Sequence, residues 1–290
     1  MHVPVLREEV LQFLEPEASE VIVDATLGGG GHAEAIADRI GEAGLLIGID
    51  QDGDAIRRAE AKLEGRKNVI IRRCNFRQFD EVLNEVGIGK VHKFLFDLGV
   101  SRDQLDEGAR GFSFLREGPL DMRMDQRTGE RAADLVNTLP EEELRHIFFR
   151  FGEERYAGKI AARIVRMRRE KSFEFTREFA DVISAGVPRT GRIHPATKVF
   201  QALRIAVNRE LEALEEGLNK AIRYLIPGGR VVVLSYHSLE DRIVKQMFRR
   251  ESQAGRIRIL TKKVVCPTAG EIAENPSSRS AKLRAAEKIA

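Results

Sequence analysis

Residues 21–32 read Val21-Ile22-Val23-Asp24-Ala25-Thr26-Leu27-Gly28-Gly29-Gly30-Gly31-His32, a short apolar run followed by an acid and four consecutive glycines. A helix-like segment comes next, at residues 33–37. A strand, a glycine turn and a helix in this order present backbone N–H groups and a helix N-terminus to a ligand. Because glycine has no side chain, a bulky cofactor can lie directly on this main chain. The stretch therefore predicts a cofactor site at the start of an α/β domain.

Length and composition limit the class of protein. The 290 residues allow one large domain, or a core with a second, smaller one, and 42% hydrophobic with 32% charged residues is typical of a globular chain with a solvated surface. The sequence has no apolar run long enough to span a membrane, and residues 1–4 do not resemble a signal peptide, so we expect a cytoplasmic protein. Cys74 and Cys266 are isolated, and no grouping has metal-ligand spacing, so we expect reduced thiols and no metal.

The first third of the chain alternates between strand and helix patterns. Apolar spacing predicts helices over residues 6–14 and 53–63, and strands over 21–23, 45–50, 69–72 and 91–97. This alternation predicts a parallel sheet with helices on both faces, which binds ligands beyond the carboxyl ends of its strands. Asp24, Asp50 and Asp97 all lie at such ends. A single aspartate there more often forms a turn, but three at one edge indicate a site, with Asp50 placed to hold ribose hydroxyls.

Helical patterns dominate after Ser101. Helices are predicted from Pro140, over residues 156–167, and from Thr176 as the N-cap. We therefore predict an α/β core over residues 1–106 and 208–290, interrupted by an all-helical domain over 107–207. A helix that begins after Pro195 and continues to Leu218 has an apolar stripe and a polar face that includes Arg204. Such a face is usually just solvated, although an arginine among uncharged polar residues also suits a base or a phosphate.

Strand patterns return near the C-terminus, over residues 225–235, 256–260 and 280–286, the first fed by a Pro-Gly-Gly turn. The segment after Ser235 should overhang the same sheet edge as the glycine turn. Its His237, with Ser235 and Asp241, could suggest a hydrolase triad, but the sequence has no nucleophile elbow. We instead expect His237, Ser238 and Glu240 to shape a substrate pocket, or to be structural.

Basic residues are unevenly distributed. From Arg242 to the end there are twelve Lys or Arg and four Glu, a surplus of eight, and residues 163–169 hold a second basic cluster. Basic patches suit a polyanionic partner but are often only solvated surface.

The glycine turn leaves two cofactor classes open. Gly28, Gly30 and Ala33 match the dinucleotide fingerprint, so a nicotinamide oxidoreductase is one alternative. Four glycines followed by His32, with an acid ending the fourth strand, fit better with an adenine-nucleoside cofactor that has no pyrophosphate.

Several motifs together resemble the bacterial MraW/RsmH family. They are Asp24-Ala25-Thr26-Leu27-Gly28-Gly29-Gly30-Gly31-His32, Asp97-Leu98-Gly99-Val100-Ser101, Arg110-Gly111-Phe112-Ser113-Phe114, Gly118-Pro119-Leu120-Asp121-Met122-Arg123-Met124-Asp125, His194-Pro195-Ala196-Thr197, Phe200-Gln201-Ala202-Leu203-Arg204-Ile205, Ser235-Tyr236-His237-Ser238-Leu239-Glu240-Asp241-Arg242, and Glu274-Asn275-Pro276 with Arg279-Ser280. They span nearly the whole chain in order.

This resemblance implies a class I (Rossmann-like) methyltransferase fold with an inserted helical domain. It implies an enzyme that uses S-adenosylmethionine to methylate the exocyclic N4 of one cytidine in 16S ribosomal RNA of the small subunit. The partner of the basic segments would then be that RNA, and methyl transfer to nitrogen needs no metal. By the same resemblance the cofactor would be contacted by Gly30, Gly31, His32, Asp50, Phe76, Asp97 and Gln104.

The substrate side of the site follows as a hypothesis. We predict that the loop of residues 97–101 aligns the amine through Asp97, and that His237 shapes or closes the cytidine pocket. Phe112 or Phe114 would stack on the base, unless both pack between the domains, and Arg204 would contact the RNA. A non-enzymatic alternative is an RNA-binding assembly factor with a relic pocket, which the three retained acids argue against.

Overall fold

The computed structural model describes residues 4–188 and 194–289, and the chain divides into two compact units. The first unit joins Met1–Gly99 to Leu211–Ala290, and the second is Val100–Glu210. These divisions lie seven residues before and three residues after the predicted ones at 106/107 and 207/208. No helix in the described part of the chain has the length and apolar character needed to cross a membrane.

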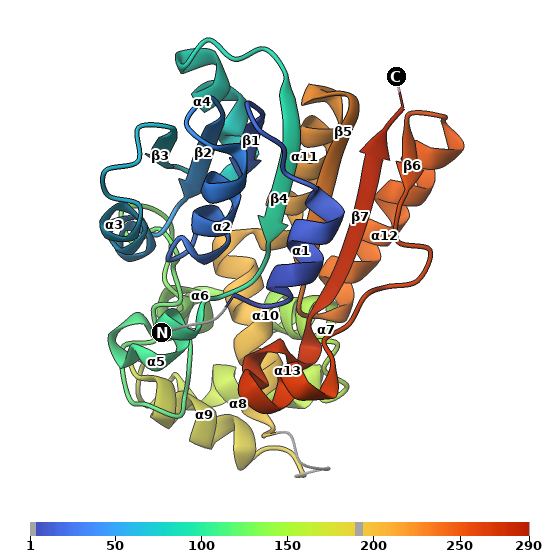
Figure 1. The fold of residues 1–290 in the computed structure, drawn as a ribbon. Coiled ribbons are helices and arrows are strands. Elements are labelled where there is room, and N and C mark those ends of the chain that lie inside the picture. Colours follow the sequence, from blue (N-terminus) through green and yellow to red (C-terminus); the bar gives the residue numbers. More distant parts are fainter. Residues whose placement is uncertain (1–3, 189–193, 290) are drawn as a thin grey trace. The chain divides into compact units, whose positions relative to one another are not determined.

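The first unit contains a seven-stranded sheet in the order β3-β2-β1-β4-β5-β7-β6 (Figure 1). The strands are β1 Val21–Asp24, β2 Leu45–Asp50, β3 Val69–Arg73, β4 Val91–Asp97, β5 Leu225–Ser235, β6 Ile257–Ile259 and β7 Lys282–Lys288. The strands from β3 to β5 are parallel, as predicted. A wholly parallel sheet is wrong, however, because β7 pairs antiparallel with both β5 and β6. The chain turns back after β6 and inserts β7 between β6 and β5, so β7 must run against both.

Helices cover both faces of this sheet (Figure 1). One face packs against α1 Arg7–Leu14, α2 Gly31–Ile40 and α3 Gly53–Lys62, and the other against α4 Phe79–Glu85, α11 Glu210–Tyr224 and α12 Ser238–Gln253. The short α13 Ala269–Glu274 precedes β7. In β1, the neighbours Ile22 and Val23 are both fully buried but belong to different cores. Alternate side chains of a strand point to opposite faces, so a continuous apolar run is what a sheet buried on both sides requires.

The second unit is helical. Its helices are α5 Arg102–Asp106, α6 Ala132–Thr138, α7 Glu141–Gly152, α8 Ala157–Met167, α9 Thr176–Ser184 and α10 Ala196–Asn208. Thr176 is not the N-cap of α9, because Phe175 holds that position. The buried Thr176 hydroxyl instead accepts a hydrogen bond from Gly118 N (3.2 Å) and donates to Arg116 O (3.1 Å). It therefore fixes the irregular segment that precedes α6 rather than starting its own helix.

Two further sequence expectations are wrong in detail. The single helix predicted from Pro195 to Leu218 is two helices, because Arg209 adopts the left-handed region (φ 50°) between α10 and α11. Hydrophobic periodicity continues across this residue and gives no sign of the break. The Pro-Gly-Gly segment does not precede β5 but lies within it, as a register irregularity opposite β4, with Gly228 at φ 78°.

Candidate functional site

Three acidic side chains meet at the carboxyl edge of the parallel strands. Asp50 ends β2, Asp24 ends β1 and Asp97 ends β4, and these three strands are neighbours in the sheet. Burial raises the pKa of Asp24 to about 7 and that of Asp97 to about 7, and raises the pKa of Asp50 to about 6. Asp50 and Asp97 add to the effect on Asp24, because like charges disfavour ionisation. The edge therefore favours a cation or a hydrogen-bond donor.

The glycine turn leaves part of the main chain uncovered beside these acids. Gly28 (φ 53°) and Gly30 (φ 79°) are left-handed, and Gly30 is the N-cap of α2. A Cβ atom on Gly29 would meet nothing within 4 Å, so the backbone there is open. A Cβ on Gly31 would instead lie 2.6 Å from Pro4 Cγ, so Pro4 covers that position. The bare backbone expected from four glycines is thus confined to the start of the turn.

Asp50 connects the turn to the loop after β2. Its Oδ2 accepts a hydrogen bond from Gly28 N and its Oδ1 accepts one from Asp52 N, both at 2.8 Å. These donors lower the pKa of Asp50 against the larger effect of burial. A carboxylate has about four acceptor positions, and the Gln51 main chain donates to this one as well, so the fixed group retains capacity for about one hydroxyl donor such as that of a ribose.

Asp97 is held by contacts from three other segments of the first unit. The Tyr236 hydroxyl donates to Asp97 Oδ1 at 2.7 Å, and Asp97 N donates to Thr26 Oγ1. The buried His32 places Nε2 3.7 Å from Asp97 Oδ2. Burial raises the pKa of Asp97, the bond from Tyr236 lowers it, and the negative charge of Glu240 raises it. The carboxylate is therefore oriented before any ligand arrives.

Sequence reasoning named Asp97 and His32 but missed Thr26 and Tyr236 as members of this cluster. Both lie inside motifs that were singled out, Thr26 in the glycine turn and Tyr236 directly after β5. Position beyond a strand's carboxyl end was the available signal for Tyr236.

His237 is the N-cap of α12. Its Nδ1 accepts a hydrogen bond from Glu240 N at 3.3 Å, and Glu240 Oε2 accepts one from His237 N at 3.3 Å, which completes a capping box. Glu240 Oε2 also accepts from Tyr236 N at 2.8 Å. Ser235 donates to Lys282 O, and Asp241 pairs with Arg284 at 2.7 Å. The hydrolase triad is therefore absent from this segment, and a structural role for His237 has direct support. Its predicted role in a cytidine pocket stays a prediction.

Phe76 follows β3 and so lies at the same sheet edge. Its ring packs edge-on against Phe96, with centroids 5.6 Å apart, and a Cβ on Gly217 would lie 2.8 Å from the ring. The half-buried ring is thus firmly held, with its predicted contact to the cofactor still a prediction.

The remaining predicted residues belong to the second unit. Gln104, 7% exposed, forms a capping box for α5, in which its Oε1 accepts from Ser101 N at 2.9 Å. Arg204 makes a two-bond ion pair with Glu210, both contacts at 2.9 Å. The contacts described for both side chains are within that unit, and their ligand roles stay predictions.

The two phenylalanines considered for base stacking differ in exposure. Phe112 is 6% exposed, belongs to the core of the second unit, and lies 5.7 Å from the Arg110 guanidinium. Phe114 is half-buried, and its ring centroid lies 4.5 Å from that of His194 and 5.0 Å from that of Phe200. Phe112 therefore has the environment of a packing residue, and Phe114 offers the more accessible ring.

Comparison with known proteins decides the family. The sequence model of the MraW methylase family matches residues 1–289. The chain belongs to this family. A relative from Geotalea uraniireducens, "Ribosomal RNA small subunit methyltransferase H", is 48% identical over 99% of this chain and 98% of its own length. A protein of the same name from Carboxydothermus hydrogenoformans is 47% identical, with the same coverage of both chains.

Membership of the MraW methylase family confirms the resemblance identified from the motifs, and the sheet order is that of the predicted α/β methyltransferase class. The predicted cofactor, S-adenosylmethionine, is confirmed at the level of this methylase family. Among solved structures, a putative rRNA-methylase from Clostridium thermocellum covers 100% of this chain and 99% of its own, with 13% identity and a TM-score of 0.49.

Proposed function

We propose that this protein transfers a methyl group from S-adenosylmethionine to the exocyclic N4 of a cytidine in 16S ribosomal RNA of the small subunit. The observation that carries the proposal is the carboxyl edge of the sheet, where open main chain at Gly29 adjoins the buried Asp24 and the half-buried Asp50 and Asp97. The relatives named as small-subunit rRNA methyltransferases support the substrate class.

The residues present fit the cofactor. A Cβ at Gly29 would occupy otherwise empty space, so the turn can accept a bulky group against its backbone. Asp50 would hold the ribose through its remaining acceptor capacity, and Gly30, Gly31, His32, Phe76 and Gln104 are the further proposed contacts. S-adenosylmethionine supplies an electrophilic methyl group on a sulfonium, whose positive charge matches an edge made of three carboxyl groups.

Asp97 would align the acceptor amine. The lone pair of a cytosine amine is delocalised into the ring, so the amine is a weak nucleophile. An ionised Asp97 would accept an amine N–H, hold the nitrogen in line with the methyl carbon, and stabilise positive charge as it develops on nitrogen. Correct alignment of two reactants can lower a barrier by about 7–11 kcal/mol. Thr26 and Tyr236 support this role because they fix the Asp97 main chain and carboxylate.

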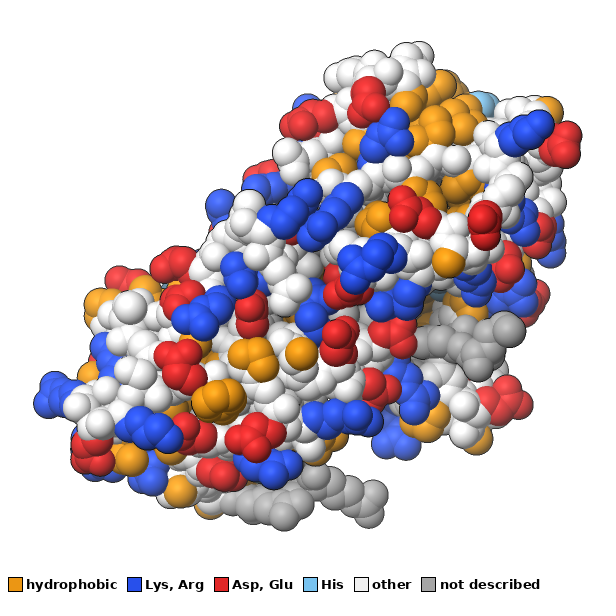
Figure 2. All heavy atoms as spheres, turned by 90° about the vertical axis from the view of Figure 1, so that its left-hand side faces the viewer, with side chains coloured by type: hydrophobic (Ala, Val, Ile, Leu, Met, Phe, Trp, Pro, Cys, Tyr) orange, Lys and Arg blue, Asp and Glu red, His pale blue; other side chains and the backbone are white. Residues whose placement is uncertain are grey.

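The basic cluster at residues 163–169 is one candidate contact surface for the RNA. In the cluster at residues 163–169, Arg168 donates to the carbonyls of Val136 and Leu139 and so has a structural function. Basic and acidic side chains lie interspersed over the face shown in Figure 2. Phosphate contacts would therefore come from exposed cations that are not paired with a carboxylate. Arg166 and Arg169 are exposed and could make such contacts.

The decisive experiment incubates small-subunit RNA with the protein and methyl-labelled S-adenosylmethionine, followed by nucleoside analysis. We expect label in N4-methylcytidine. Label in another nucleoside would refute the base specificity, and no label in RNA would refute the activity and favour a non-enzymatic assembly factor. Retention of NAD without S-adenosylmethionine binding would favour the oxidoreductase alternative.

A further inference from the structure

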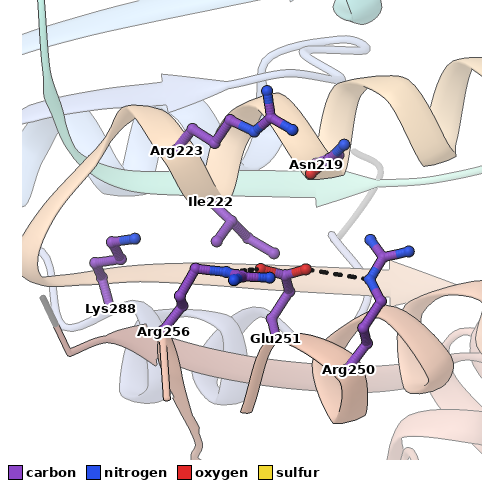
Figure 3. Close-up of a pocket in the computed structure, with 7 residues that line it drawn as sticks. All are labelled: Asn219, Ile222, Arg223, Arg250, Glu251, Arg256 and Lys288. Carbon is purple, nitrogen blue, oxygen red and sulfur yellow. Dashed lines mark hydrogen bonds and ion pairs between the residues drawn. The ribbon is translucent and has the colours of Figure 1, made fainter. Parts of the chain in front are cut away.

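A pocket of about 500 Å³ lies away from the carboxyl edge, within the first unit (Figure 3). It is lined by Asn219, Ile222, Arg223, Arg250, Glu251, Arg256 and Lys288. Arg223 is in the last turn of α11, directly before β5 begins, and Lys288 is the last residue of β7, which runs against β5. The pocket is therefore at the amino end of β5. Val91 of β4 pairs with Leu225 and Asp97 with Leu234, so six steps of about 3.3 Å along β4 place the pocket roughly 20 Å from the carboxyl edge.

Four cations and one carboxylate line this pocket, which leaves a formal surplus of three positive charges. Glu251 is 5% exposed and pairs with Arg256 Nε (2.6 Å) and Arg250 Nε (3.2 Å) (Figure 3). The hydrogen bond from Arg256 lowers the pKa of Glu251, so this carboxylate is ionised, and the two arginines balance its negative charge. Both arginines bind it through Nε, and their side chains remain 63% and 51% exposed for Arg250 and Arg256.

The other two cations have no such partner. Over residues 4–188 and 194–289, no carboxylate forms an ion pair with Arg223 or Lys288. Lys90 adds a further cation at the Arg223 main chain, because its Nζ donates to Arg223 O at 2.8 Å. Figure 3 shows Arg223 on the α11 side of the pocket and, across from it, Arg250 from α12, Arg256 from the segment before β6 and Lys288 from the end of β7.

Helix dipoles account for only part of this arrangement. Cations near a helix C-terminus stabilise it, which applies to Arg223 in α11 and Arg250 in α12. Arg256 lies outside helices but pairs with Glu251, so Lys288 is the one of these four cations that neither a helix dipole nor a carboxylate of the described residues accounts for. Of the four cations, Arg223 and Lys288 have no carboxylate partner in the described part of the chain, and arginine and lysine side chains without one are suited to phosphate oxygens.

We propose that this pocket, defined as the distal basic pocket, binds the phosphodiester backbone of the substrate RNA. The inference rests on the proposed function, because the RNA is the polyanion that this function supplies. An RNA segment that reaches the pocket must extend about 20 Å along the first unit from the carboxyl edge. A short oligonucleotide around the target cytidine does not reach that far, whereas the intact small-subunit RNA does.

The test compares Arg223→Gln/Lys288→Gln with a control double variant, Arg39→Gln/Lys67→Gln. The control removes two exposed cations of the same unit, on α2 and before β3 at the opposite flank of the sheet. Arg250 and Arg256 are left intact, since their loss would leave Glu251 buried without a partner. The measurement is the dissociation constant for intact small-subunit RNA as a function of KCl concentration.

Each phosphate contact contributes about 0.7–0.9 to the slope of log affinity against log salt, so the loss of two contacts should lower that slope by about 1.4–1.8 in the test variant. The same slopes predict a loss of affinity of about 25- to 60-fold near 0.1 M salt, and neither change in the control. Methyl transfer to a short RNA hairpin containing the target cytidine should be unchanged in both. Asn219→Glu, a single change at the rim of the pocket, should weaken binding of the intact RNA in the same direction.

Failures of the two proposals are distinguishable. If the unaltered protein methylates RNA but the test variant keeps its slope and affinity, the distal basic pocket is not an RNA contact. If the unaltered protein methylates neither RNA, the proposed function fails. Polyglutamate that displaces the RNA as well as a phosphodiester chain of equal charge would overturn the assignment to phosphates and favour an acidic protein partner.

Discussion

Removal of the Tyr236 hydroxyl should shift the pH dependence of methyl transfer. The hydroxyl donates to Asp97 at 2.7 Å and lowers a pKa that stands at about 7. A hydrogen bond to a charged group contributes about 1.5–3 kcal/mol, and one pKa unit corresponds to about 1.4 kcal/mol. Tyr236→Phe should therefore raise the pKa of Asp97 by about 1–2 units.

The consequence for activity depends on the proposal that ionised Asp97 aligns the amine. Near pH 7 the ionised fraction would fall from about one half to about 1–10%, so kcat/KM should fall about 5- to 50-fold. At about pH 10 both proteins would be ionised and their rates should converge. A bound sulfonium lowers the pKa in both proteins, so the difference between them is the quantity to compare.

The assay is tritiated-methyl transfer to small-subunit RNA, with kcat/KM measured from about pH 6 to about pH 10. Tyr224→Phe is a matched control, because it removes a phenolic hydroxyl from the same unit at a ring that packs on Phe79. Its profile should match that of the unaltered protein. Superimposable profiles for Tyr236→Phe would refute the reasoning, and so would a loss of equal size at every pH.

Four other substitutions test the site. Asp50→Ala should weaken S-adenosylmethionine binding by about 10- to 150-fold in calorimetry, the equivalent of about 1.5–3 kcal/mol of charge-assisted hydrogen bonding, and unchanged affinity would remove Asp50 from the ribose role. Asp97→Ala should abolish methyl transfer with near-normal RNA affinity in filter binding, and normal turnover would exclude Asp97 from amine alignment. Gly29→Ala should keep the melting temperature, because its Cβ meets nothing within 4 Å, yet weaken cofactor binding; full cofactor affinity would place the ligand elsewhere. Asp24→Asn should stabilise the protein above about pH 7 more than at about pH 5, since a folded pKa of about 7 against 3.8 means that stability falls as pH rises between these values, by at most about 4 kcal/mol; equal melting temperatures in both buffers would contradict this.

The sequence predicted local elements better than their connections. Strands such as β2 and β4 were predicted residue for residue, because a buried strand is an apolar run with clear ends. The direction of β7 could not be predicted, since pairing with β5 is a property of the assembled sheet. The break at Arg209 was equally hidden, because apolar spacing continues while one backbone dihedral changes.

For the candidate site, too, some residues could be predicted from the sequence, whereas their contacts could not. Asp24, Asp50 and Asp97 were identifiable because each ends a recognisable strand, and parallel strands bring their carboxyl ends to one edge. The bond from Tyr236 to Asp97 joins residues 139 positions apart, and no spacing rule relates them. Likewise, Pro4 covers Gly31 but not Gly29, a difference that four identical residues in sequence cannot express.

The acids at the carboxyl edge lower the stability of the folded protein when they ionise. Burial raises the pKa of Asp24 and Asp97 to about 7, so ionising them in the folded protein is unfavourable compared with the unfolded chain. Neutral side chains of similar size would remove this unfavourable term. Under the proposed function, a cation or an amine placed beside the acids would favour their ionised forms. The two cores of this unit are packed with apolar side chains. Carboxyl groups with raised pKa values, gathered at one edge of such a unit, are what is expected of a binding site.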